Sequence, residues 1–559
     1  MPSALSTSMS STSTSPASSS STSTTTATTT PTTAPKAATT PITAPKATTS
    51  TTAPSLKAAA AGDPSIDPFC PGNLVGTTYT LIGNCGPSAF PITVPANIAT
   101  VDGAGHTIFG DDTAPGDAEF DGGVLMNDPA NHMMNIKNLT IAGPATGFQE
   151  CGPNGAADVL YGIWFKDASG TLNNVIVDHI WQQQSLAFPS CQTGRAVRAD
   201  GVTAARTVTI TSTKVMDYQK SGFEARGLGA SMTMDVSGSA AGPPHALEGC
   251  IAQNAIEWVF ADATGTAARN TFIGSGDQGP PTCATESPDN GTAVLMYGAT
   301  GVTVDHNVIT GSNTDIGVSV TAGSTGDVIS FNQIGRTAPD TPDPTGHGID
   351  VDNTPVVRTT SANFVRPAQV TAADPPPDAT LTCNTFTNWR FNVVGALQIA
   401  CTPLPNGCES QPYSAHTPAV EGFTQTIPPG PPTLAWSTTA GTLPPGLTLA
   451  SHGAITGTPT ALGTSHFTVQ VDDPSDPNLL ATQAESITIA DCTPPTTTVP
   501  VTPTTAGPDT ATAPADVTGT LPRTGGTGAL PLVGLALLGA GTLFTGVARR
   551  ERGRRRKAS

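Results

Sequence analysis

The central part of the chain, residues 65–400, carries its hydrophobic residues in short runs that are broken by Gly, Asn and Asp. Within a run, apolar and polar residues alternate as they do along a half-buried β-strand, and almost nothing has the spacing of an amphipathic helix. One pattern recurs, because residues 302–309 (VTVDHNVI) resemble residues 328–334 (VISFNQI), with Asn307 matched to Asn332. The pattern predicts repeated pairs of short strands.

Other segments look like further copies of this unit. Residues 162–170 resemble 257–265, 293–301 and 317–323, and related strand pairs occur at 208–215, 269–273 and 381–386. A unit of about 25 residues cannot bury its own apolar face, whereas stacked units can. We therefore predict a right-handed parallel β-helix over residues 65–405. In it, Asn307 and Asn332 would stack as a ladder of turns rather than act as ligands.

A family resemblance supports this fold. Residues 101–108 (VDGAGHTI) resemble the strand near the start of pectate-lyase-like and copper-transport-associated β-helix repeat proteins. The resemblance implies the fold, not a reaction, and gives His106 a structural role. Segments rich in Pro, Gly and Cys are expected to leave the solenoid as loops over one face, where binding specificity usually resides. They are residues 144–158, 183–195, 275–290 and 336–346.

A second module is predicted over residues 406–492. Its residues 441–449 (GTLPPGLTL) and 453–459 (GAITGTP) resemble the core of bacterial Ig-like, cadherin-like modules. Pro and Gly make the turns, and Leu447 and Leu449 would both face the core of a β-sandwich. Cys408 and Cys492 bracket the module, so we expect a disulfide between them. The resemblance implies a spacer or a module that binds glycan or protein.

Both ends of the chain differ from these modules. Ser and Thr make up 33 of the first 60 residues, so residues 1–64 are predicted to be a disordered, glycosylatable arm. No apolar run of a secretory signal peptide follows Met1, so an exported form would need its signal upstream. Residues 493–520, rich in Pro and Thr, are predicted to be a wall-spanning linker.

The C-terminus has the features of a membrane anchor. Residues 527–548 contain no charge and are followed by a basic tail, residues 549–559. This predicts one transmembrane helix with the tail on the cytoplasmic side, as a single span before processing. Before it, residues 521–525 (LPRTG) resemble the LPXTG cell-wall sorting signal of Gram-positive surface proteins. Motif, apolar span and basic tail stand in that family's order, over residues 521–559.

The sorting signal implies specific partners. A sortase would recognise Leu521, Pro522 and Thr524 and cleave between Thr524 and Gly525. The threonine would then be joined covalently to peptidoglycan. The resemblance therefore implies an extracellular, cell wall-anchored protein of a Gram-positive bacterium, with an extracellular glycan or a host surface as a further partner.

Composition narrows the range of partners. Charged residues are only 12% of the chain, too few to solvate many amphipathic helices. Residues 1–524 carry 17 basic and 41 acidic side chains, a net charge of −24, which excludes nucleic acid and favours cations, neutral glycans or basic surfaces. The ten cysteines form no CxxC motif, so disulfides in an oxidising exterior are expected rather than zinc sites.

Several polar residues are candidates for catalysis on the solenoid. In residues 347–353 (HGIDVDN), alternation would place Asp350 and Asp352 on one outward face beside His347, as acid and base carboxylates or as Ca²⁺ ligands. Similar same-face pairs are Arg198 with Asp200 and Glu224 with Arg226. The alternative is that all of these are solvated polar positions of an acidic solenoid. No cofactor other than Ca²⁺ is indicated.

These observations leave three functions open. The first is a sortase-anchored surface protein that displays the β-helix for adhesion or for binding of a glycan or other partner, without catalysis. The second is a wall-anchored polysaccharide lyase or glycoside hydrolase. The third is a structural component of a surface layer.

Overall fold

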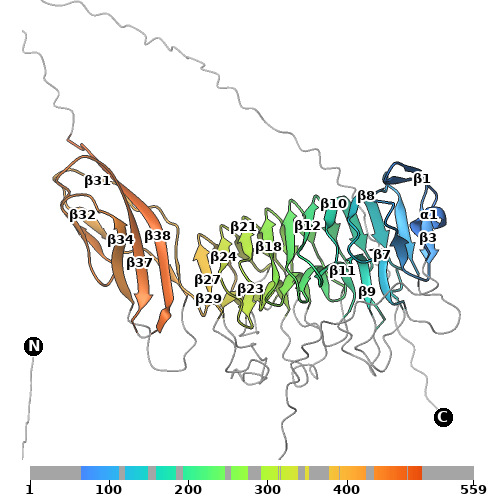
Figure 1. The fold of residues 1–559 in the computed structure, drawn as a ribbon. Coiled ribbons are helices and arrows are strands. Elements are labelled where there is room, and N and C mark those ends of the chain that lie inside the picture. The colour runs from blue at the N-terminus through green and yellow to red at the C-terminus, as the bar shows by residue number, and fades with distance from the viewer. Residues whose placement is uncertain are drawn as a thin grey trace, which may run out of the picture. The chain divides into compact units, whose positions relative to one another are not determined.

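The computed structural model describes thirteen stretches of the chain and shows an all-β protein (Figure 1). The described residues are 64–111, 120–148, 159–183, 193–245, 253–274, 291–311, 314, 316–337, 346–351, 377–389, 391–422, 434–474 and 476–493. Their only helix, α1 (Ile66–Phe69), is one turn long. The strands form a parallel solenoid followed by a small sandwich, as predicted.

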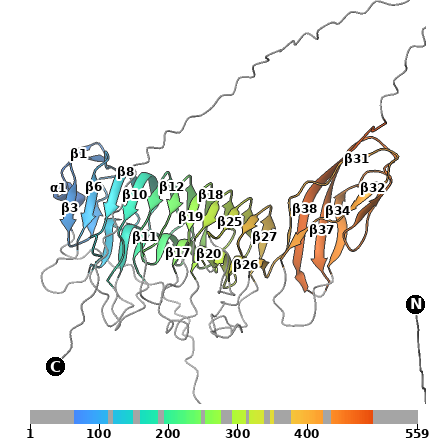
Figure 2. The same ribbon diagram turned by 180° about the vertical axis from the view of Figure 1, so that it is seen from behind.

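One side of the solenoid, sheet A, is a ladder of ten parallel strands (Figures 1 and 2). Each strand pairs with the strand one coil further along the chain, as β14 does with β17. The strands are β4 (Ile92–Val94), β7 (Gly122–Asn127), β9 (Leu160–Phe165), β11 (Arg195–Gly201), β14 (Ser221–Gly227), β17 (Asn254–Val259), β20 (Thr292–Tyr297), β23 (Ile316–Thr321), β26 (His347–Val351) and β29 (Phe391–Val394).

The remaining sides form sheet B, which has 19 strands in two columns. The first column is β2 (Thr78–Leu81), β5 (Thr100–Asp102), β8 (Met134–Ala142), β10 (Gly170–Asp178), β12 (Arg206–Thr211), β15 (Met232–Ser237), β18 (Ala263–Ala268), β21 (Thr303–Asp305), β24 (Asp327–Ser330) and β27 (Ala379–Thr382). The second is β3 (Cys85–Ser88), β6 (Thr107–Gly110), β13 (Lys214–Val215), β16 (Ala240–Ala241), β19 (Thr271–Ile273), β22 (Val308–Thr310), β25 (Gln333–Gly335) and β28 (Thr385–Thr387). Strands β8 and β10 span both columns, and β1 (Gly72–Val75) pairs antiparallel with β2.

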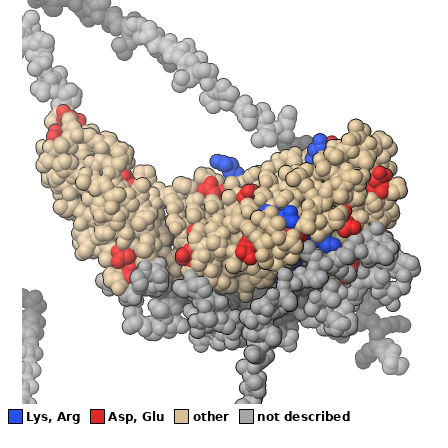
Figure 3. All heavy atoms as spheres, viewed as in Figure 1, with Lys and Arg blue, Asp and Glu red and all other residues tan. Residues whose placement is uncertain are grey.

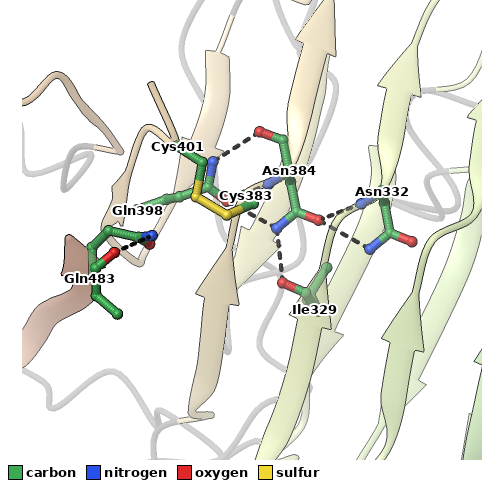
Figure 4. Close-up of a disulfide and its surroundings, with 8 residues drawn as sticks. Ile329, Asn332, Cys383, Asn384, Gln398, Cys401 and Gln483 are labelled. Atoms are coloured by element: carbon green, nitrogen blue, oxygen red, sulfur yellow. Dashed lines mark hydrogen bonds between the residues drawn. A yellow bond between two sulfur atoms is a disulfide. The ribbon is translucent and has the colours of Figure 1, made fainter. Parts of the chain in front are cut away.

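The predicted asparagine ladder is confirmed and is longer than predicted. Asn307 and Asn332 are buried at the corner between the two columns of sheet B, and Asn307 N and Nδ2 donate to Asn332 Oδ1 at 2.9 and 3.0 Å. Asn270 and Asn384 continue the ladder, which ends at Gln398 of β30 (Gln398–Ile399). Figure 4 shows this end of the ladder, from Asn332 through Asn384 to Gln398. Each amide satisfies buried backbone groups of the neighbouring coil.

Small residues occupy one inward position in seven successive strands of sheet A, from β9 to β26. They are Gly162, Ala196, Gly222, Ala255, Ala293, Gly317 and Gly348. These residues are equivalent because, in each strand, the residues directly before and after this position are paired in register with the next strand. A Cβ on Gly317 would lie 2.5 Å from the Gly348 carbonyl oxygen and 2.5 Å from a methyl carbon of Ile334. The backbones therefore pack too closely there for a larger side chain.

The repeat alignment was partly wrong. It matched Gly162 with Glu257, whereas the strand register makes Gly162 equivalent to Ala255. The match of Gly170 with Gly265 is correct, because both lie in one register of sheet B. The turn between sheets A and B is therefore two residues longer in the later coil, and sequence similarity had followed the turn rather than the strand.

The second module is a sandwich of two sheets in which most neighbouring strands are antiparallel. One contains β31 (Gly407–Cys408), β34 (Ala435–Gly441), β37 (Gly463–Asp473) and β38 (Asp476–Ala490), and the other β32 (Tyr413–His416), β35 (Leu447–Leu449) and β36 (Ile455–Gly457). Strand β30 pairs with β33 (Val420–Glu421). Leu447 is buried in the core and Leu449 packs against it, as predicted.

Three disulfides link described cysteines, and one of them is the predicted bond between Cys408 and Cys492. The others are Cys70–Cys85 and Cys383–Cys401. The remaining four cysteines lie outside the described residues. So do nearly all of the predicted arm, the linker, the transmembrane helix at 527–548 and the sorting signal. Among the described residues, no helix is long and apolar enough to cross a membrane.

Candidate functional site

Among the described residues, the largest group of buried charges lies on the outer face of sheet A, across three successive coils. Trp164, Arg198, Glu224 and Glu257 occupy one register position in β9, β11, β14 and β17. Because equivalent residues of neighbouring parallel strands lie about 4.8 Å apart, their side chains are in contact range. All four are buried.

Glu224 is the centre of this network. Its Oε1 is 2.5 Å from Arg226 Nε, its Oε2 is 3.3 Å from Arg198 Nη1, and Oε2 also contacts Arg195 Nε. Arg198 also donates to Asp200 Oδ1 at 2.9 Å. Glu257 Oε1 is 3.9 Å from Arg195 Nε, so three carboxylates and three guanidinium groups balance one another in charge.

Burial and charge act in opposite directions on Glu224. Burial by itself raises the pKa of a carboxyl group, but Arg195, Arg226 and Arg198 hold the pKa of Glu224 well below its ordinary value. Burial likewise lowers the pKa of Arg198, and Asp200, Tyr161 and Glu224 outweigh it and raise that pKa. Glu224 is thus an ionised carboxylate, which cannot serve as a general acid.

The predicted same-face pairs are present, but they are not solvated. Arg198 is 7% exposed, and Asp200 and Glu224 are 0% exposed, so the interpretation as solvated surface positions is wrong for them. The two predicted pairs also form one network rather than two, because Arg198 contacts Glu224. Whether Arg198 and Asp200 have a catalytic role stays a prediction.

The second predicted cluster lies further along the same face. In β26, His347 Nδ1 is 2.9 Å from Asp350 Oδ2, and both residues are buried. Three coil steps, roughly 14 Å at the usual strand spacing, separate Asp350 from Glu257, so the two predicted clusters do not form one site. Asp352 lies outside the described residues, and the predicted Asp350–Asp352 pair and its Ca²⁺ site are therefore untested.

An exposed aromatic surface borders the buried network. Phe260 and Tyr297, in successive coils, are 40% and 41% exposed, and Phe260 N donates to the Tyr297 carbonyl oxygen. The Arg226 guanidinium lies 5.6 Å from the Phe260 ring centroid. Sequence reasoning missed this rim, although both rings follow apolar strands in segments that had been aligned as repeats.

A second surface feature lies over the last coils of sheet B. A hollow of about 500 Å³ is lined by His306, Val308, Phe331 and Cys383, among others. The His306 and Phe331 rings stack with centroids 4.9 Å apart. Cys383 is joined to Cys401, as Figure 4 shows, so a disulfide fixes one side of the hollow.

The described part of the chain contains one group that could hold a metal ion, Asp178, His179 and Asp217. The face shown in Figure 3 carries scattered acidic and basic residues without a large patch of either sign. That nucleic acid is not a partner stays a prediction.

Comparison with known families identifies the second module. Residues 401–491 match the family model He_PIG, described as "Putative Ig domain". Comparison with curated protein sequences gave no match.

Three solved structures are similar to the chain. A double mutant of the periplasmic alginate epimerase AlgG has 11% identity and a TM-score of 0.26, with 63% of this chain and 68% of that chain covered. PfbA, a surface adhesin of Streptococcus pneumoniae, has 9% identity and a TM-score of 0.26, with 60% and 94% covered. A tailspike mutant of E. coli bacteriophage HK620 has 11% identity and a TM-score of 0.16, with 73% and 84% covered.

These scores are low, so the description of the solenoid rests on the register of its own strands. The chain therefore consists, in its described part, of a parallel β-helix followed by an Ig-like module that matches the He_PIG family over residues 401–491.

Proposed function

We propose that this protein is displayed on the outer surface of a Gram-positive cell, where its β-helix serves adhesion or binds a glycan or another partner. The observation that carries this proposal is the network around Glu224. Its charges pair with one another and, apart from the partly exposed Arg226, are buried, so they stabilise the coils and offer no free acid or base to a substrate. The exposed rim of Phe260, Tyr297 and Arg226 is the kind of surface that stacks on sugar rings.

Display on the surface is supported by the sorting signal and by the disulfides. The three disulfides fit an oxidising exterior. In this proposal a sortase recognises Leu521, Pro522 and Thr524, breaks the bond between Thr524 and Gly525, and joins the threonine to peptidoglycan. The apolar segment 527–548 holds the chain in the membrane until then.

Replacing Thr524 with Ala tests the anchoring. The variant is expected to stay in the membrane fraction with its tail intact, because the replacement removes the threonine side chain that the sortase recognises in its motif. Fractionation and immunoblotting of cells that express the full chain would measure this, with Thr520→Ala as the control just outside the motif. If Thr524→Ala is still attached covalently to wall fragments, the sortase assignment is wrong.

Binding without turnover is the expected activity. The full chain should bind at least one polymer in a panel of neutral glycans and uronic-acid polymers. The double variant Phe260→Ala/Tyr297→Ala should lose about thirty-fold in affinity, since each of the two stacked rings contributes roughly 1 kcal/mol. Phe90→Ala, which removes a ring of similar exposure (41%) elsewhere, is the control and should bind normally. Co-sedimentation measures binding.

The alternative function is a wall-anchored polysaccharide lyase or glycoside hydrolase. It is favoured by one observation, that Arg198, Asp200, Glu224, His347 and Asp350 all belong to strands of sheet A and crowd one side of the solenoid. Incubating the full chain with the same panel of glycans and uronic-acid polymers, with and without Ca²⁺, distinguishes binding from catalysis. New reducing ends or the absorbance of an unsaturated product would contradict the binding proposal, as would the absence of any bound polymer.

A further inference from the structure

A cluster of His and Asp side chains lies at the corner that follows sheet B, away from the network of sheet A. Asp178 is the last residue of β10 and His179 follows it, and Asp217 follows β13 in the next coil. His179 Nδ1 is 3.1 Å from Asp178 Oδ2, and His179 Nε2 is 3.6 Å from Asp217 Oδ2. One ligand atom from each of the three residues lies within 4.8 Å of the others. Their side chains are 25% to 35% exposed, so a solute can reach them.

Asp217 is held in place by two further side chains. His245 Nδ1 lies 2.7 Å from Asp217 Oδ1, and Trp181 Nε1 donates to Asp217 Oδ2 at 3.0 Å. The Trp181 and His245 rings stack with centroids 3.7 Å apart and planes 11° apart. In metal sites, ligating carboxylates are characteristically oriented by such outer hydrogen bonds. Because a carboxylate has about four lone-pair sites, Asp217 can accept both bonds and still bind a cation.

The backbone brings these residues together from distant parts of the sequence. Val177 is in register with Val215, which makes His179 and Asp217 equivalent positions of adjacent coils. Ile180 N donates to the Asp217 carbonyl oxygen at 3.0 Å, so the two corners are hydrogen-bonded directly. The positions of the three ligands therefore depend on the solenoid and not on a free loop.

We propose that Asp178, His179 and Asp217 bind a divalent transition-metal ion such as Zn²⁺, with water completing its coordination. One imidazole with two carboxylates suits Zn²⁺, Co²⁺ or Mn²⁺, whereas Ca²⁺ takes oxygen ligands only. His245 and Trp181 position Asp217 without touching the ion. The bound ion would add a link between two adjacent coils that already meet through the Ile180–Asp217 backbone hydrogen bond and the Trp181–Asp217 side-chain hydrogen bond.

The chain contains a matched control for this site. Asp305 and His306 form the same sequential pair, with His306 Nδ1 2.6 Å from Asp305 Oδ2, and both His179 and His306 have a positive φ, 57° and 53°. Among the described residues, no third ligand completes a metal group around this second pair. If Asp178–His179 is a simple ion pair, replacing His179 or His306 should have the same effect on metal binding. If it belongs to a metal site, only the replacement of His179 should weaken metal binding.

The test uses the untagged full chain, stripped with a chelator and titrated with ZnCl₂ by calorimetry and equilibrium dialysis. The wild-type chain should bind one more equivalent of Zn²⁺ than the variant His179→Ala/Asp217→Asn. Each single variant should bind at least about ten-fold more weakly, and His245→Ala should weaken binding without abolishing it. His306→Ala should bind like the wild type.

Two additional measurements distinguish a variant that no longer binds the metal from a variant that no longer folds. Far-UV circular dichroism should show that each metal-free variant retains the β-sheet spectrum, and Zn²⁺ should raise the melting temperature of the wild type but not of His179→Ala. Co²⁺ should give a visible absorption band that is lost in His179→Ala. Equal stoichiometry in the wild type and the double variant, a loss in His306→Ala, or saturation by Ca²⁺ alone would each overturn the proposal.

Discussion

Replacing Glu224 with Ala is expected to destabilise the β-helix by about 4 kcal/mol, because removing one partner of a buried ionic network leaves the other charges uncompensated. Glu224 is 0% exposed and contacts Arg195, Arg198 and Arg226. Without it, Asp200 is the main remaining partner of Arg198, and Arg195 and Arg226 lose their shortest ion pairs. Urea unfolding of the full chain, followed through the transition of the β-helix, measures the change.

Two variants complete this experiment. Glu224→Gln keeps the volume and the hydrogen-bonding capacity but not the charge, so it should fall between the wild type and Glu224→Ala. Asp262→Ala removes an exposed acid on the neighbouring turn and should change the free energy of unfolding by about 0.5 kcal/mol or less. A loss below about 1 kcal/mol in Glu224→Ala would show that the network does not stabilise the fold.

The stability that Glu224 contributes should also depend on pH. Its pKa in the folded chain is lowered by the three arginines, so the contribution is fully present above the unfolded-state pKa of about 4.3. It is lost as the pH falls toward and through the folded-state pKa, because protonation then removes the charge. Glu224→Gln should lose this part of the acid sensitivity.

The sequence predicted the solenoid because some of its requirements are local. A buried asparagine at the same corner of four successive coils leaves a visible spacing, and Asn307 and Asn332 were placed in the ladder from that spacing alone. Ig-like turns are local as well, since Pro and Gly fix the bends around Leu447. These signals concern one turn or one strand at a time, so they could be recognised without knowledge of distant contacts.

The network on sheet A could not be predicted in the same way. Alternating apolar and polar residues predict a strand with one face in the core and one face in solvent, whereas β11, β14 and β17 are buried on both faces. The ion pairs of Glu224 then depend on the register between β11 and β14, and neither strand was among the segments aligned as repeats. The cluster of His179 and Asp217 was missed for a related reason, because its members are adjacent only after the coils are aligned.

The second large effect is expected at the Ig-like module. Removing the Cys408–Cys492 disulfide by the double replacement Cys408→Ser/Cys492→Ser should lower the free energy of unfolding by about 4.5 kcal/mol. The bond spans 84 residues of sequence, nearly the whole module, so its loss gives the unfolded chain much more conformational freedom. In the folded module, Cys408 belongs to β31, a two-residue strand that pairs with the end of β38.

The matched comparison is the Cys383–Cys401 disulfide, which spans only 18 residues at the end of the solenoid. Cys383→Ser/Cys401→Ser should cost about 3 kcal/mol, since a shorter loop loses less entropy when it is closed. Differential scanning calorimetry of the full chain would assign each loss to its own transition. If the loss of the longer bond leaves the transition of the Ig-like module within about 1 kcal/mol of the wild type, then strand pairing rather than the disulfide holds β31 against β38.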